Sequence, residues 1–72
     1  MTSAFTWGDT VRVSASAPNW MRPGEVASVY SVLVGDEVPT YRAFRPGPVY
    51  GIEFGDGSSI EVEEAFLEPR GT

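Results

Sequence analysis

The residues of this sequence that could carry acid–base or metal chemistry are glutamates near its C-terminal end. Glu61, Glu63 and Glu64 lie close together, and neighbouring carboxylates can share a proton or bind a cation through their oxygens. The sequence has no histidine and no cysteine, so the common general base, the thiolate nucleophile and the usual zinc ligands are missing. Glu61 and Glu63 occupy alternate positions of a predicted strand, which places both on its solvated outward face, where charges discourage edge-to-edge pairing. We therefore predict no catalytic residue, no metal site and no cofactor.

A second group of residues combines aromatic rings with arginines. Trp20 lies in one predicted loop, and Tyr41, Arg42, Phe44 and Arg45 lie in another. Large aromatic side chains and arginine are the residue types enriched at the energetic centres of protein interfaces. An alternative is that Trp20 and Phe44 cover open ends of a small core while the arginines are solvated. We predict that these five residues bind a partner, which is a separate protein or a second copy of this chain.

The elements that must position these residues are short strands, and the clearest of them form a hairpin. In residues 49–54, apolar side chains at Tyr50, Ile52 and Phe54 alternate with Gly51 and a glutamate, the period of a strand with one buried face. Residues 58–62 repeat that alternation. The Gly-Asp-Gly sequence between the two runs is typical of a tight hairpin turn. A lone hairpin is not stable in water, so the rest of the chain must complete the sheet.

The remaining segments predict three further strands and two irregular loops. Residues 10–14 and 25–34 read as strands, and the uneven apolar spacing of the second predicts a β-bulge near Ala27 and Ser28. Residues 15–23 and 35–47 show no strand or helix pattern, and the latter loop is long for so small a domain. Residues 63–69 predict one helical turn followed by a short last strand that ends at proline.

Together these elements predict an all-β protein with a single small barrel. We expect about five short, strongly bent antiparallel strands with one helical turn near the C-terminus. Residues 1–6 are predicted to be a disordered or frayed tail in which Phe5 can pack against the domain, residues 7–69 the barrel and residues 70–72 a second tail. The aromatic residues assigned to the core are Trp7, Tyr50, Phe54 and Phe66.

Composition limits the compartment and the partners. The 72 residues make one domain, and the absence of cysteine favours a reducing, cytoplasmic location. No signal-peptide pattern or membrane-length apolar run is present, so no membrane association is expected. Ten acidic residues face five arginines and no lysine, for a net charge of −5. Because binding to a phosphate backbone draws on clustered basic residues, nucleic acid is a poor partner for this chain, whereas a protein with a basic surface would suit it.

Several phrases of the sequence resemble the SH3-like barrels of bacterial enzymes. They are a Gly-Asp-x-Val-x-Val opening at residues 8–13, Pro-Gly-Glu-Val at residues 23–26, the strand at residues 49–54 and a closing acidic, aromatic phrase at residues 64–69. This order is similar to the C-terminal barrel of nitrile hydratase β subunits and their accessory proteins, and more distantly to KOW barrels and type II dihydrofolate reductases. The resemblance implies a barrel in which the loops carrying Trp20 and Tyr41 flank the same end of the sheet.

The departures from these families bear on function. Nitrile hydratase barrels have a His-Arg-Pro-Tyr-like loop of which Arg22 and Pro23 remain here, and the metal-binding cysteines of that enzyme lie on another subunit. Type II reductases rely on a lysine and a Val-Gln-Ile-Tyr phrase. This chain has no lysine, and residues 59–63, which include two glutamates, stand where that phrase would fall. We expect a non-enzymatic protein-binding module, an accessory or neutralising partner of another protein. The alternatives are a subunit of an oligomeric enzyme whose site is shared between chains, or a KOW-like contact with RNA or the ribosome.

Overall fold

The computed structural model describes residues 3–70, which form strands joined by loops and single helical turns. The strands are β1 (Thr10–Val13), β2 (Val26–Leu33), β3 (Val49–Phe54), β4 (Ser59–Glu63) and β5 (Leu67–Pro69). Three turns of 3₁₀ helix accompany them: η1 (Asn19–Met21), η2 (Gly35–Glu37) and η3 (Glu64–Phe66). The predicted fold class is confirmed, including the helical turn before the last strand. Among these residues no helix has the length and apolar character that crossing a membrane would require.

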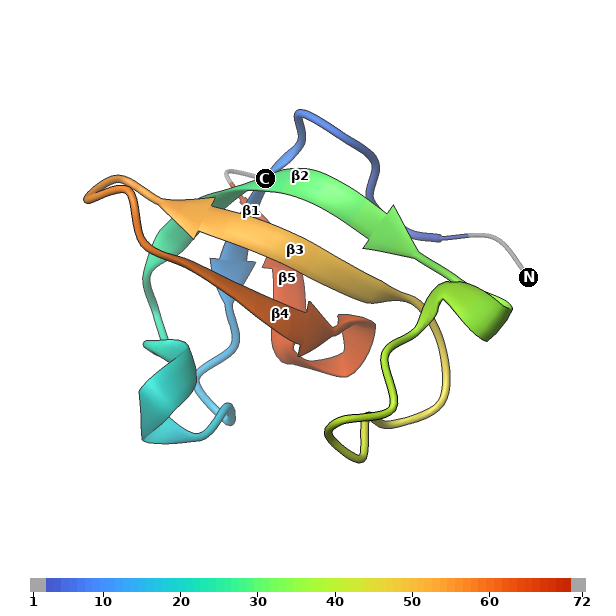
Figure 1. Cartoon of the computed structure of the whole chain (residues 1–72). Coiled ribbons are helices and arrows are strands. Elements are labelled where there is room, and N and C mark those ends of the chain that lie inside the picture. Colours follow the sequence, from blue (N-terminus) through green and yellow to red (C-terminus); the bar gives the residue numbers. More distant parts are fainter. Residues whose placement is uncertain (1–2, 71–72) are drawn as a thin grey trace.

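The five strands form one antiparallel sheet in the order β4-β3-β2-β1-β5. Figure 1 shows β2 and β3 arching across the front of the molecule, while β1 and β5 lie behind them. The curl lets the concave face of the sheet enclose one hydrophobic core, to which every strand contributes. The fully buried side chains at its centre include Val11, Val13, Val29, Tyr50, Ile52 and Val62. Among the described residues β4 and β5 end the sheet, so each has one edge without a neighbouring strand.

The hairpin predicted for residues 49–62 is present as β3 and β4. Ile52 pairs with Ile60 and Tyr50 with Val62, so the alternating apolar side chains of both strands face the core. Gly57 closes the turn with φ of 88°, a left-handed conformation that glycine adopts without steric cost. The opposite face carries Glu61 and the side chains that flank it, and this face is where the candidate site lies.

The β-bulge in β2 lies two to three residues beyond its predicted place. Val29 pairs with Ile52 and Ser31 with Gly51, which leaves Tyr30 as the extra residue. The prediction of a bulge near Ala27 and Ser28 was therefore wrong in position. Ala27 and Val29 keep the two-residue alternation and are both buried, so the alternation is broken after Val29 rather than before it.

The N-terminal segment differs from the sequence-based assignment at two aromatic residues, Trp7 and Phe5. Trp7, assigned to the core, is 74% exposed and lies in a turn closed by the bond from the Asp9 amide to the Thr6 carbonyl. Phe5 takes the core position instead, with its ring edge-on to Tyr50 at 5.5 Å. Tyr50 and Phe54 are buried as predicted, and Phe66 packs partly buried against the core. The predicted tail therefore packs from Phe5 onwards, and residues 1, 2, 71 and 72 lie outside the described part.

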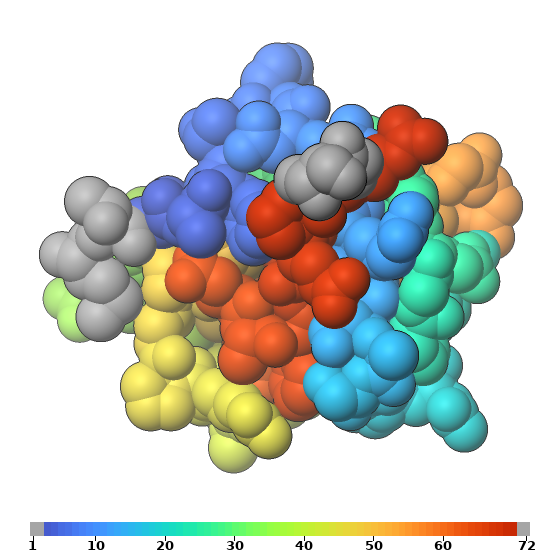
Figure 2. Space-filling model, turned by 180° about the vertical axis from the view of Figure 1, so that it is seen from behind, coloured from blue at the N-terminus to red at the C-terminus, as the bar shows by residue number. Residues whose placement is uncertain are grey.

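The C-terminal turn η3 lies between the first loop (residues 15–23) and the long loop (residues 35–47). The Phe66 carbonyl accepts a hydrogen bond from the Ser14 amide at 2.8 Å, and the Glu64 amide donates to the Pro48 carbonyl at 3.2 Å. Figure 2 shows the same arrangement from behind, with the orange-to-red C-terminal segment between the yellow end of the long loop and the light-blue first loop. These bonds fix one end of each loop to a common point of the fold.

Candidate functional site

Arg42 stands at the centre of the candidate site, where the long loop between β2 and β3 crosses β4. Its Nη2 donates to the main-chain carbonyl of Glu61 at 2.7 Å, and its Nη1 donates to Oε1 of Glu63 at 3.4 Å. The guanidinium carbon lies 4.0 Å from the centre of the Phe44 ring and 5.0 Å from that of Trp20. Arginine over an aromatic face is a favourable cation–π arrangement. One side chain thus connects the long loop, the first loop and the edge strand.

Glu63 is the buried partner of this arginine. Its side chain is only 4% exposed, and Oε2 accepts a hydrogen bond from the Arg45 amide at 3.2 Å. The sequence places Glu63 on the solvated face of a strand, and this assignment was wrong because the loop covers that face. A buried carboxylate requires a counter-charge and donors for its oxygens, and Arg42 together with the Arg45 amide supplies both.

Tyr41 is the most exposed member of the site, with 73% of its surface accessible. Its hydroxyl donates to the carboxylate of Glu61, and its ring meets Phe44 edge-on at 5.9 Å. The hydrogen bond to Glu61, followed by burial of the hydroxyl, raises the pKa of Tyr41. The phenol therefore stays protonated at neutral pH and keeps donating to Glu61.

Trp20 reaches the site from the first loop. It belongs to η1, which is anchored by the buried Met21, and 52% of the tryptophan remains exposed. The prediction that the first loop and the long loop meet at one end of the sheet agrees with the proximity of Trp20 to Arg42. Neither Trp20 nor Phe44 belongs to the core cluster or to the partly buried residues packed against it.

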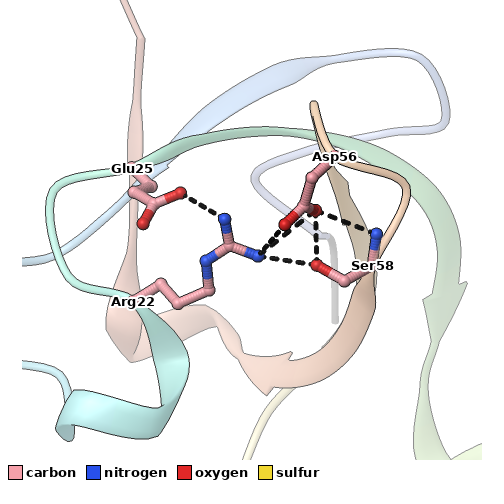
Figure 3. A network of polar contacts seen from close by, with 4 residues as sticks. All are labelled: Arg22, Glu25, Asp56 and Ser58. Carbon is pink, nitrogen blue, oxygen red and sulfur yellow. Dashed lines mark hydrogen bonds and ion pairs between the residues drawn. The ribbon is translucent and has the colours of Figure 1, made fainter.

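A network around Arg22 holds η1 in place. Arg22 Nη2 contacts Glu25 at 2.7 Å, while Nη1 contacts Asp56 at 3.2 Å and donates to the Ser58 hydroxyl at 2.6 Å (Figure 3). Its guanidinium also lies 4.1 Å from the centre of the Phe54 ring. Arg22 has φ of 63°, a conformation that is costly for a residue with a side chain. These contacts offset that cost and tie the segment after Trp20 to the β3–β4 turn.

The network also changes the acidity of Asp56. Its carboxylate accepts hydrogen bonds from the Ser58 hydroxyl and amide, and then from Arg22, which holds the pKa of Asp56 well below its usual value. The carboxylate is therefore ionised throughout the neutral and mildly acidic range.

Arg45 lies apart from the other predicted residues. Its guanidinium stacks 4.9 Å from the centre of the Phe66 ring, on η3, rather than against Trp20 or Tyr41. The structure thus brings Trp20, Tyr41, Arg42 and Phe44 into one cluster, hereafter the loop cluster, and places Arg45 beside it.

Sequence reasoning missed two residues next to this cluster. Tyr30, extruded by the bulge, lies across Gly51, since a Cβ built on that glycine would come within 2.8 Å of Tyr30 Cζ. Gly51 is the cross-strand neighbour of Glu61, so the tyrosine ring and the carboxylate share one face of the sheet. The signal was the glycine itself, because a glycine inside a strand often marks the close approach of another group.

An apolar hollow of about 500 Å³ lies at the base of the long loop. It is lined by Val34, Gly35, Val38 and residues 46–48.

Within residues 3–70 no three side chains of histidine, cysteine, aspartate or glutamate are grouped in a way that could hold a metal ion. Comparison of the chain with protein-family models, curated proteins and solved structures finds no match.

Proposed function

We infer that this protein is a non-enzymatic protein-binding module with an SH3-like barrel, which uses Trp20, Tyr41, Arg42, Phe44 and Arg45 to contact another protein. The observation that most supports this proposal is that Trp20 and Tyr41 are exposed while Arg42, beside Trp20, is bonded to the edge strand β4. Exposed aromatic side chains on a fixed frame lose little entropy on binding, which is the property of an interface anchor. The curled five-stranded sheet around one core supports the barrel assignment.

The chemistry of the cluster favours binding over catalysis. The charge of Glu63 is paired with that of Arg42, and Glu61 accepts a hydrogen bond from the Tyr41 hydroxyl. Neither carboxylate is therefore arranged to exchange a proton with a substrate. Arg45 adds a donor whose planar group is held on Phe66, with its nitrogens available to a carboxylate of the partner. As an accessory or neutralising partner, the protein needs no more than such a surface.

Site-specific photo-crosslinking in the native host tests this proposal. A benzophenone amino acid at position 41 or 20 should give discrete adducts with one protein, whereas the same group at position 7 should not. Trp7 is the matched control because it is as exposed as Tyr41 but lies in the turn before β1. Adducts of equal yield at positions 7 and 41, or none at either 41 or 20, would contradict the proposal.

The double variant Tyr41→Ala/Arg45→Ala checks that the surface is separable from the fold. It should weaken association with the crosslinked protein while the free energy of unfolding changes by less than about 1 kcal/mol, because both side chains are largely exposed. Unfolding of this variant would show that the loop is structural and would remove the binding interpretation.

A further inference from the structure

The two carboxylates of the edge strand do not have matched counter-charges. Glu61 and Glu63 share one face of β4, and within residues 3–70 Arg42 is the cation in contact with this pair. Arg42 binds the carboxylate of Glu63 but only the main-chain carbonyl of Glu61. The Glu61 carboxylate is held by an uncharged donor, the Tyr41 hydroxyl. One negative charge therefore remains at this point of the surface.

Two tyrosine side chains lie near this charge. The Tyr41 hydroxyl donates to the carboxylate, and the Tyr30 ring crosses the sheet over Gly51, the cross-strand neighbour of Glu61. Both are partly exposed, and Glu61 itself is intermediate in burial. Ring faces beside a carboxylate attract a cation through the quadrupole as well as the charge.

We propose that the Glu61 carboxylate, bonded to Tyr41 and on the same face of the sheet as Tyr30, is the subsite for a lysine or arginine side chain of the protein partner. This inference rests on the proposed function and adds the chemistry of the partner's contact residue. Charge complementarity supports it, since the chain carries a net charge of −5 and the subsite retains one of those charges uncompensated. The same net charge opposes a second copy of this chain as the occupant, because two copies repel each other.

The subsite accounts for features that packing alone does not require. Gly51 permits the Tyr30 ring to cross the sheet at the position paired with Glu61, since any Cβ there would collide with the ring. The polar bonds of Arg42 hold the loop that carries Tyr41 against β4. Both rings are therefore in place before the partner arrives, which lowers the entropic cost of binding.

Titration with a blocked tripeptide, acetyl-Gly-Arg-Gly-amide, tests the subsite. Its control is the peptide in which citrulline, an uncharged isostere, replaces arginine. At constant ionic strength and neutral pH, the arginine peptide should produce saturable NMR shifts at Glu61, Tyr30 and Tyr41, and the citrulline peptide should not. Glu61→Gln should weaken the binding about fivefold, near the upper limit for an exposed ion pair.

Glu53→Gln is the matched control variant, because Glu53 is an exposed carboxylate of β3 that lies on the same face of the sheet as Glu61. It should bind the arginine peptide as the unmodified chain does. Equal shifts with citrulline, shifts spread over all carboxylates, or equal losses in both variants would each overturn the subsite. With the crosslinking group at position 20, a loss of crosslinking in Tyr41→Ala but no loss in Glu61→Gln would also overturn the subsite, and it would leave the proposed binding surface standing. If the purified chain dimerises and Glu61→Gln abolishes the dimer, the occupant of the subsite is a second copy of this chain. That result would overturn the proposal of a separate protein partner.

Discussion

Replacing Arg42 with alanine should destabilise the domain far more than its position in a loop suggests. The substitution leaves Glu63, whose side chain is 4% exposed, as a buried carboxylate without a counter-charge. Removing one partner of a buried ion pair costs about 3–5 kcal/mol. Two features favour the lower end: the arginine side chain is 29% exposed, and the Nη1 to Oε1 distance of 3.4 Å is long. We therefore expect a loss of about 3 kcal/mol.

Thermal and urea unfolding followed by circular dichroism measures this loss. For a domain of this size, each kcal/mol lowers the melting temperature by about 4–8 °C, so Arg42→Ala should melt about 12–24 °C lower. Arg12→Ala is the control, because Arg12 is an exposed residue of β1, and it should change stability by less than about 0.5 kcal/mol.

The double variant Arg42→Ala/Glu63→Gln separates the buried charge from the lost contacts. An uncharged amide in place of the carboxylate removes the uncompensated charge, so the double variant should be more stable than Arg42→Ala by about 1–2 kcal/mol. A loss in Arg42→Ala no larger than that in Arg12→Ala would refute the reasoning. A double variant less stable than Arg42→Ala would show that Glu63 does not depend on the arginine.

Three further predictions concern the frame of the site. Ile52→Ala should cost about 2–5 kcal/mol in urea unfolding, because Ile52 is fully buried at the centre of the core; an unchanged melting temperature would contradict the strand assignment. Gly51→Ala should cost about 1–3 kcal/mol, because the new Cβ would meet Tyr30 Cζ at 2.8 Å and Ser31 Cβ at 3.0 Å. Adding Tyr30→Ala should relieve the part of that loss that is due to the ring, and fully additive losses would show that the ring does not lie there. Asp56 has a native pKa below its unfolded value of about 3.9, so it stabilises the fold above that pH and loses its contribution as the pH falls towards the native pKa. The urea midpoint of the unmodified chain should therefore fall more steeply below about pH 4 than that of Asp56→Asn, and parallel curves would exclude the Arg22 network as the cause.

Much of the fold could be predicted because its signals are local. Alternation at Tyr50, Ile52 and Phe54 fixed one face of β3, and the turn glycines fixed the hairpin. The bulge of β2 was predicted in kind but misplaced, since the apolar residues 26–34 permit more than one register and only pairing with β3 selects Tyr30 as the extra residue. Trp7 was misassigned because size and hydrophobicity do not reveal that Phe5 already fills the space beside Tyr50.

Residue type and spacing by themselves determined an all-β domain, a net negative charge, the absence of histidine and cysteine, and two loops rich in aromatic and arginine side chains. Tertiary structure decided what those side chains contact. Strand alternation places Glu61 and Glu63 opposite the core, but it does not say whether solvent or another segment covers that face. Residues about twenty positions earlier in the chain cover it, and Arg42 turns Glu63 into a buried ion pair while Glu61 remains partly open. Contacts between such distant positions depend on how the loop closes over the sheet, and no local pattern encodes that closure.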